Sequence, residues 1–216
     1  MSANDFAVVH DMPLPYLLSL PVKSGEAAAP FPVFIFLHGY EEGPPMELRD
    51  GITAHGPLRP GSSPLATSEF IVAAPQLPAR GDLWRFEAEA VRDIVHQMHT
   101  RYGGDFQRTY LSGFSFGGNG VFDIALRLPD LWAALWPVDP TRVPESDPGL
   151  PVWLSSGDAS RPRSRQFIAR LQLEEPHTPS QQRVYADEGL DHVGTATSAY
   201  RNDGIYRWLL SQHRKE

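Results

Sequence analysis

The strongest constraint on the fold of this chain is a regular alternation of short apolar runs with amphipathic helical patterns from residue 33 onward. Continuous apolar runs are typical of parallel strands that are buried on both faces. Such runs lie at residues 33–37, 70–74, 109–112, 133–138 and 152–154, with a weaker one at 183–186. Strands that alternate with helices predict a mostly parallel sheet with helices on both faces, which is an α/β fold.

Two further patterns complete the expected architecture. Residues 87–102 repeat apolar side chains at spacings of three and four, which predicts a helix with one buried face. Residues 6–10 and 16–20 flank a proline-containing turn and predict an antiparallel pair at one edge, for eight strands in total. In sheets of this kind ligands bind beyond the carboxyl ends of the strands, so the loops that follow each strand are the place to look for chemistry.

Length and composition exclude several classes of protein. The 216 residues predict a single domain spanning residues 1–216. The net charge of −7 gives no attraction to nucleic acid or to an anionic membrane surface. No cysteine is present, which removes disulfides, thiolate metal sites and a cysteine nucleophile. Asp5 and Asp11 precede the first cation, Lys23, and this order is unlike a secretory leader. We therefore expect a cytoplasmic monomer or homodimer that binds neither nucleic acid nor membrane.

The motif G-x-S-x-G occurs as Gly113-Phe114-Ser115-Phe116-Gly117. It directly follows a strand pattern and directly precedes a helical one, which is the context in which a sharp turn exposes a nucleophilic serine. Side chains at the two glycine positions would collide with the neighbouring strand and helix. The sequence therefore predicts Ser115 as a nucleophile.

A serine hydroxyl becomes nucleophilic when a histidine removes its proton, and in this kind of site the chain order is serine, acid, histidine. Only His177, His192 and His213 follow Ser115. His177 lies in a polar stretch flanked by prolines and His213 in the charged tail, which favours surface positions for both. His192 lies between the last strand and the last helix, on the same edge as the serine, and we predict that it is the base.

The acid that supports the histidine has two candidates. Asp158 follows the strand at residues 152–154, two positions beyond the serine strand, and is the first choice. Asp139 also ends a strand and is the second choice. Asp187 and Asp191 are too close in sequence to His192 to support it from behind.

The remaining site residues are expected on the loops at the same edge. The backbone N–H of Phe116 and that of Tyr40, with Gly39 as the alternative, are predicted to bind the oxyanion. His38 precedes them and is expected to brace its loop rather than to act as a base. Three residues on strand-end loops are predicted to line the substrate cleft: Leu77, Trp84 and Trp136.

Several longer motifs carry a family resemblance that covers about residues 33–212. They are the Ala-Pro-Gln at residues 74–76 with a tryptophan downstream, the extended serine motif at 113–120, and segments 128–134, 199–200 and 206–212. The chain resembles the compact carboxylesterase and predicted-peptidase branch of the α/β-hydrolases, which are relatives of phospholipase/carboxylesterases and feruloyl-type esterases. The resemblance implies an α/β-hydrolase fold and a triad of Ser115, Asp158 and His192. The chain departs from this branch in having Asp191 before the histidine and a run of small residues after it.

The expected function is hydrolysis of a small-molecule carboxylic ester through an acyl-serine, with no metal or cofactor. Only residues 139–151 separate the strand after the serine helix from the next strand, which leaves no room for a cap domain and favours short or compact acyl groups. A peptidase or thioesterase would use the same triad, because the triad does not select the leaving group. A hydrolase-shaped binding protein without catalysis is the third alternative.

Overall fold

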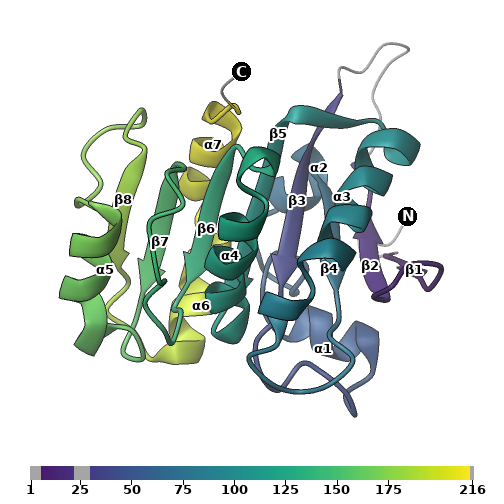
Figure 1. Cartoon of the computed structure of the whole chain (residues 1–216), viewed down its shortest axis with the longest axis horizontal. Coiled ribbons are helices and arrows are strands. Elements are labelled where there is room, and N and C mark those ends of the chain that lie inside the picture. The colour runs from purple at the N-terminus through teal and green to yellow at the C-terminus, as the bar shows by residue number, and fades with distance from the viewer. Residues whose placement is uncertain (1–5, 22–29, 215–216) are drawn as a thin grey trace.

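The computed structural model describes residues 6–21 and 30–214, so Asp5 and Lys23 lie outside the described residues. An eight-stranded sheet crosses the molecule in the order β1-β2-β4-β3-β5-β6-β7-β8 (Figure 1). The strands are β1 (Ala7–Val9), β2 (Tyr16–Ser19), β3 (Phe31–Leu37), β4 (Ile71–Pro75), β5 (Gly104–Phe114), β6 (Ala134–Val138), β7 (Val152–Ser156) and β8 (Arg183–Asp187).

The pairing of the strands confirms the predicted mostly parallel sheet. Strands β4, β3, β5, β6, β7 and β8 pair in parallel, whereas β1 pairs antiparallel with β2 and β2 antiparallel with β4. Strand β5 begins earlier than its apolar run indicates, because Gly104 already pairs with Phe31 at the start of β3. The two expected edge strands are therefore present, and every predicted apolar run contributes a strand.

The helices cover both faces of the sheet. They are α1 (Leu48–Ala54), α2 (Leu65–Glu69), α3 (Ala88–Tyr102), α4 (Phe116–Arg127), α5 (Ser164–Leu171), α6 (His192–Arg201) and α7 (Asp203–Ser211). Short 3-10 helices lie at Trp84–Phe86, Pro129–Leu131 and Arg161–Arg163. Helices α3, α4 and α5 pack on one face, and α1, α2, α6 and α7 on the other.

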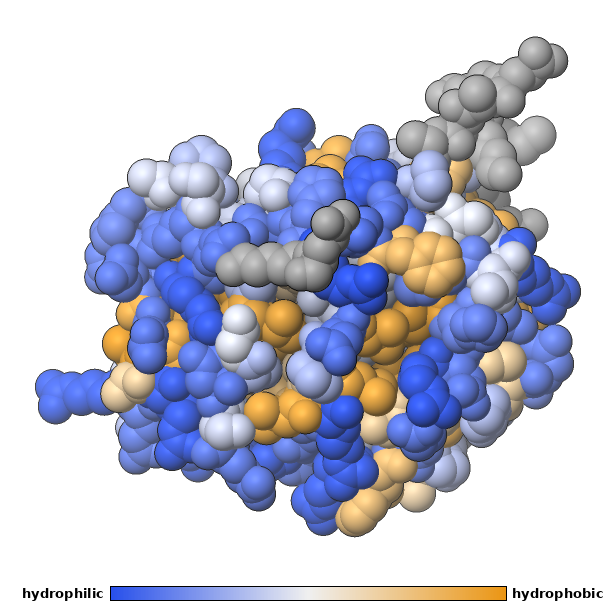
Figure 2. All heavy atoms as spheres, turned by 45° about the horizontal axis from the view of Figure 1, so that its top comes forward, coloured by the Kyte–Doolittle hydropathy of each residue, from blue (hydrophilic) through white to orange (hydrophobic). Residues whose placement is uncertain are grey.

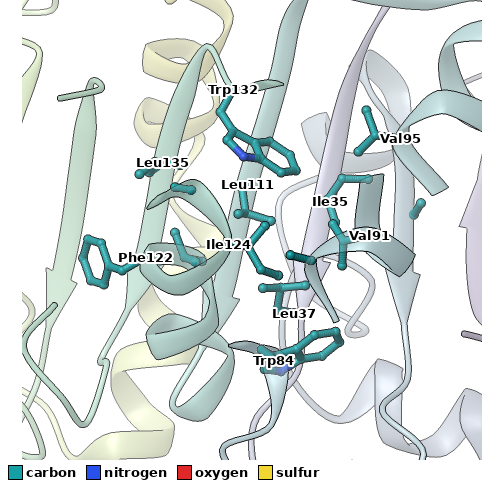
Figure 3. Packing of buried hydrophobic residues seen from close by; sticks show 14 of the residues in the cluster. Ile35, Leu37, Trp84, Val91, Val95, Leu111, Phe122, Ile124, Trp132 and Leu135 are labelled. Atoms are coloured by element: carbon teal, nitrogen blue, oxygen red, sulfur yellow. The ribbon is translucent and has the colours of Figure 1, made fainter. Parts of the chain in front are cut away.

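Each face of the sheet has its own hydrophobic core, and β3 shows how one strand serves both. Its Ile35 and Leu37 enter the core beneath α3 and α4, where Figure 3 shows them with Trp84 and Leu111. The alternate residue Phe34 enters the second core, beneath α6 and α7. This alternation explains why the strand is an uninterrupted apolar run: successive side chains point to opposite faces, and both faces are buried.

The carboxyl ends of the parallel strands meet at one edge, at the bottom of Figure 1. Residues 139–151, all of them described, join β6 to β7 without a helix or strand, so no cap domain is inserted there. The opposite end of the molecule, turned forward in Figure 2, is mainly hydrophilic with apolar side chains between the polar ones. Among the described helices, none has the length and apolar character that crossing a membrane requires.

Candidate active site

Ser115 lies at the sharp turn between β5 and α4, in a backbone conformation that is rare for a residue with a side chain. Its φ of 58° and ψ of −116° fall outside the common regions for non-glycine residues. The turn is held on both sides, because Ser115 N donates to the carbonyl of Val138 (3.0 Å) and its own carbonyl accepts from Asn119 N (3.1 Å). Strain of this kind persists only where the surrounding structure determines it, and it is concentrated at functional sites.

The close approach of backbones around this turn requires glycine at two positions. A Cβ atom on Gly117 would lie 1.9 Å from the carbonyl oxygen of Leu37, and one on Gly113 would lie 2.4 Å from that of Gly117. Both distances are far below van der Waals contact with atoms of the main chain, which cannot yield. The two glycines of the motif therefore bring the first turn of α4 directly against the end of β3.

His192 is the first residue of α6, and its ring is held from two sides. The helix is capped by Asp191, whose side chain accepts from Gly194 N (2.6 Å). The Nδ1 atom of His192 lies 2.5 Å from Oδ2 of Asp139, and its ring packs on Phe114 with centroids 4.5 Å apart. A carboxylate only accepts hydrogen bonds, so Nδ1 carries the proton and Nε2 presents its lone pair.

Asp139 is completely buried, and its two carboxylate oxygens have separate roles. Oδ1 accepts hydrogen bonds from Gly157 N (2.7 Å), Ser160 N (3.3 Å) and Ser160 Oγ (2.6 Å). Oδ2 is left for His192. The residue directly follows β6 with a φ of 43°, and its N–H donates to the carbonyl of Ser155 (2.8 Å). The carboxylate is thus fixed in orientation before any substrate arrives.

The prediction that Asp158 supports His192 is wrong, and the second candidate, Asp139, takes that position. Asp158 lies on the exposed turn after β7, and 56% of its side chain is accessible to solvent. Its N–H donates to the carbonyl of Leu190 (3.0 Å), while its carboxylate pairs with Arg161 at the surface. The turn therefore directs the side chain of Asp158 away from the buried space beside His192.

Asn119 links the serine turn to the loop that carries Asp139. Its Oδ1 accepts from the N–H groups of Thr141 (2.9 Å) and Arg142 (3.0 Å), and its Nδ2 donates to Thr141 Oγ1 (2.9 Å). Arg142 extends the link through an ion pair with Asp123 (2.7 Å) on α4. The sequence motif included Asn119, but its positioning role depends on these tertiary contacts.

The loop after β3 passes over the serine. A Cβ on Gly39 would lie 3.2 Å from Ser115 Cβ, so the N–H of the next residue, Tyr40, lies close to the turn. Within the described part of the chain, neither the N–H of Tyr40 nor that of Phe116 donates to a protein acceptor. The rings of these two residues meet edge to face, with centroids 5.8 Å apart.

His38 braces this loop, as the sequence indicated. Its Nε2 accepts from Leu77 N (2.9 Å), so its Nδ1 donates to the carbonyl of Gly39 (2.6 Å). Burial lowers the pKa of His38 to about 4, and the ring stays neutral at physiological pH. The neutral ring thereby ties the loop after β3 to the loop after β4.

The three residues predicted to line the cleft are buried in the protein instead. Leu77 and Trp84 belong to the core beneath α3 and α4, where Figure 3 shows Trp84 among apolar side chains. The indole of Trp84 donates to the carbonyl of His38 (3.0 Å). Trp136 lies in the opposite core, 4.7 Å from the ring of Tyr200. All three are at most 1% exposed, so this part of the prediction is wrong.

Sequence reasoning missed two polar residues near the turn, Glu42 and His55. Glu42 is only 5% exposed, and its Oε1 lies 3.5 Å from Nε2 of His55. The ring of His55 packs on Phe114, the same ring that His192 contacts. A glutamate in a Gly- and Pro-rich loop gives no sign of burial in the sequence, because the loop and α1 that enclose it are tertiary features.

The fold is similar to that of solved serine hydrolases. A thermostable esterase matches with a TM-score of 0.71 and 21% identity over 97% of this chain, and this chain spans only 64% of that esterase. A fluorophosphonate-binding serine hydrolase of Staphylococcus aureus gives 0.67 at 11% identity, covering 94% of this chain and 98% of the other. A serine hydrolase without a lid from Xanthomonas campestris gives 0.61 at 17% identity, covering 96% of each.

By sequence, no family model and no curated protein matches the chain. The structural matches nonetheless extend over nearly all of it, with TM-scores of 0.61 to 0.71. The chain has the α/β-hydrolase fold, and the expected fold class is confirmed.

Proposed function

We propose that this protein is a serine hydrolase that cleaves carboxylic esters through an acyl intermediate on Ser115. The observation that supports this most directly is the 2.5 Å contact between His192 Nδ1 and the buried carboxylate of Asp139, beside a serine in a strained turn. A serine, a histidine with a free Nε2 and a fixed carboxylate are the three groups that acyl transfer through a serine needs.

In the proposed reaction His192 accepts a proton and donates it again in each of two half-reactions. Its Nε2 takes the proton of Ser115 Oγ while that oxygen bonds to the ester carbonyl carbon. The carbonyl oxygen becomes negative and accepts from the N–H groups of Tyr40 and Phe116. The C–O bond of the alcohol then breaks, and the alcohol oxygen receives the proton. A water molecule repeats the sequence on the acyl-serine and releases the acid. Every step uses protein groups, so the proposal includes no metal or cofactor.

Asp139 stabilises the histidine when it is charged. The imidazolium that forms during attack donates from Nδ1 to a carboxylate whose other oxygen is already occupied by three donors. The carboxylate therefore needs no reorientation during the reaction, so a preorganised site of this kind has no cost in reorganisation free energy when His192 becomes charged.

The proposed substrates are small esters with a short or compact acyl group. The short connection of residues 139–151 supplies no lid over Ser115. Three exposed large apolar side chains, Tyr40 (47% exposed), Leu190 (42%) and Val193 (49%), lie on the loop after β3 and around the start of α6. A long acyl chain would stay in contact with water and gain little of the ~0.8 kcal/mol that each buried CH₂ provides. The leaving group is not selected by these residues.

A fluorophosphonate probe tests the proposal, because it reacts only with an activated serine. The wild-type protein is expected to be labelled and to hydrolyse p-nitrophenyl acetate, whereas Ser115→Ala is expected to do neither. Ser68→Ala, which changes an exposed serine on α2, serves as the matched control and is expected to behave as wild type. Parallel assays with a thioester and an anilide of the same acid determine the leaving group. Wild-type protein that is neither labelled nor active would refute the proposal and favour a non-catalytic binding protein.

A further inference from the structure

Glu42 is a buried carboxylic acid that the proposed reaction does not use. Its side chain is 6% exposed, and its Oε2 atom has no hydrogen-bond partner within residues 6–21 and 30–214. Burial raises the pKa of Glu42, because the charged form loses its hydration. An unpaired buried polar atom costs free energy, and native proteins keep few of them without a use for them.

The unpaired oxygen lies beside the proposed nucleophile. A Cβ on Gly39 would lie 3.0 Å from Glu42 Oε2 and 3.2 Å from Ser115 Cβ, so these two atoms are within about 6 Å of each other. A substrate bonded to Ser115 would therefore have atoms in the neighbourhood of Oε2.

His55 adds a second unpaired atom to the same region. Its Nε2 faces Glu42 Oε1 at 3.5 Å, and its Nδ1 is buried without a partner among the described residues. Burial lowers the pKa of His55, so the ring is neutral and has one donor and one acceptor nitrogen. Both His55 and His192 pack on Phe114, at 5.0 and 4.5 Å between centroids, which places all of these polar groups around one ring.

The loop is held by backbone contacts that do not involve Oε2, although the carboxylate also lies close to the backbone N–H groups of Gly39 and Glu42. The loop is held by its backbone, since the carbonyl of Glu42 accepts from Gln76 Nε2 at 2.7 Å. Gly51 on α1 packs against this carbonyl so closely that a Cβ there would lie 2.4 Å from it. An apolar side chain of similar size would fill the same space without an unpaired oxygen. A costly polar group beside a nucleophile is typical of a group that binds substrate.

On the basis of the proposed hydrolase function, we propose that Glu42 and His55 form a subsite for a hydroxyl group carried next to the scissile ester. The hydroxyl donates to Glu42 Oε2, and His55 lines the same space with a group that can either donate or accept. The substrate class is therefore hydroxylated esters, with the hydroxyl on the acid or on the alcohol. A hydroxyl fits better than an ammonium group, because Arg59 already places positive charge near His55 and His192 becomes positive during attack.

Matched pairs of esters test this subsite and locate the hydroxyl. Methyl 2-hydroxypropanoate against methyl propanoate examines the acid side, and 2-hydroxyethyl acetate against propyl acetate examines the alcohol side. Wild-type protein is expected to prefer the hydroxylated member of one pair by ~10-fold or more in kcat/KM, since a site built for a hydroxyl rejects the analogue that lacks it. Hydrolysis is followed by titration of the released acid.

Three variants show whether Glu42 carries the preference. In Glu42→Leu the ratio of kcat/KM within the preferred pair is expected to fall to about one, because the acceptor is lost. Glu42→Gln keeps an oxygen acceptor and is expected to retain most of the ratio. Glu41→Leu changes the exposed neighbour and is expected to leave the ratio at its wild-type value.

The possible failures are distinguishable. Hydrolysis of the plain esters without preference in either pair, or a preference that survives in Glu42→Leu, overturns the subsite and leaves the proposed hydrolase function in place. Absence of hydrolysis for all four esters overturns both. If Glu42→Leu does not fold, the kcat/KM ratios of the wild-type protein and of Glu42→Gln still test the subsite. A ratio of about one in Glu42→Gln would contradict the proposal that an oxygen of residue 42 accepts from the hydroxyl.

Discussion

Replacing Asp139 by asparagine removes one charge from the proposed triad, and the structure indicates which way the new amide will face. The Oδ1 position accepts from Gly157 N, Ser160 N and Ser160 Oγ, so the amide oxygen has to occupy it. The amide NH₂ then faces His192 Nδ1, which has to accept. In that tautomer Nε2 carries the proton and is unable to take another from Ser115.

The size of the loss follows from two contributions. The productive tautomer of His192 requires the amide oxygen to face Nδ1, so the amide has to turn around. This would leave the N–H groups of Gly157 and Ser160 unpaired at about 1 kcal/mol or more each, and the productive tautomer is therefore populated about 30-fold less. Loss of the charge-assisted bond to the imidazolium costs about 1.5–3 kcal/mol more, or another ~10- to 150-fold. Together they give a fall in kcat on the order of 10³-fold, somewhat below the ~10⁴ found for the equivalent change in a serine protease.

The assay is steady-state kcat for p-nitrophenyl acetate, with circular dichroism to verify that the variant is folded. Asp158→Asn is the matched control: it changes an exposed aspartate that pairs with Arg161, and kcat is expected to stay within about twofold of wild type, since exposed ion pairs contribute little. A larger loss in Asp158→Asn than in Asp139→Asn, or a loss below about tenfold in Asp139→Asn, would refute the assignment of the acid.

Two further predictions concern stability. Gly117→Ala is expected to destabilise the fold by several kcal/mol or prevent folding, because its Cβ would overlap the carbonyl of Leu37. Gly149→Ala is the control: its φ is 74° and no atom lies close to its Cβ position, so the expected cost is only about 1–2 kcal/mol. Urea denaturation measures both changes. The raised pKa of Glu42 means that its contribution to stability is present below the ordinary value of 4.5 and is lost as the pH rises through the raised value. Glu42→Gln is therefore expected to increase the free energy of unfolding at pH 8 more than at pH 4, and an equal change at both values would contradict a buried carboxyl.

The sheet was predictable from the sequence because its strands are buried on both faces. Every strand from β3 onward contains an apolar run, and the strong period of α3 predicted that helix to within one residue of its start. The beginning of β5 was not predictable, since it depends on the pairing of Gly104 with Phe31 of β3, and the register shifts between this pair and the next one, Thr109 with Val33. Local pattern therefore located the elements, and pairing partners determined their full length.

The candidate site was predictable only in part, for a geometrical reason. Ser115 and His192 follow from motif and chain order, but Asp139 and Asp158 both follow a buried strand at the same edge. Which of them faces the histidine depends on side-chain direction: Asp139 turns inward to the donors of Gly157 and Ser160, and Asp158 turns outward to Arg161. Nothing in the order of residues along the chain distinguishes the two directions.

Trp84 illustrates the same limit for aromatic residues. A tryptophan after a strand was predicted to line the cleft, but here it packs against the second turn of α4, where a Cβ on Gly120 would lie 2.4 Å from Trp84 Cβ. The glycine-rich start of that helix, which the motif explains only as far as Gly117, thus also makes room for a large ring.

The link made by Asn119 has a consequence for how the protein can change over evolutionary time. Its amide holds Thr141 and Arg142 against α4, so the serine turn and the Asp139 loop form one structural unit. An insertion between Asp139 and Arg142 would break these hydrogen bonds and change the position of Asp139 relative to Ser115. The turn that carries Asp158 is bound to the same unit, because its Gly157 and Ser160 donate to Asp139 Oδ1. Only the side chain of Asp158 itself points outward, to Arg161 at the surface, so substitutions of that side chain are more easily accommodated than insertions into its turn.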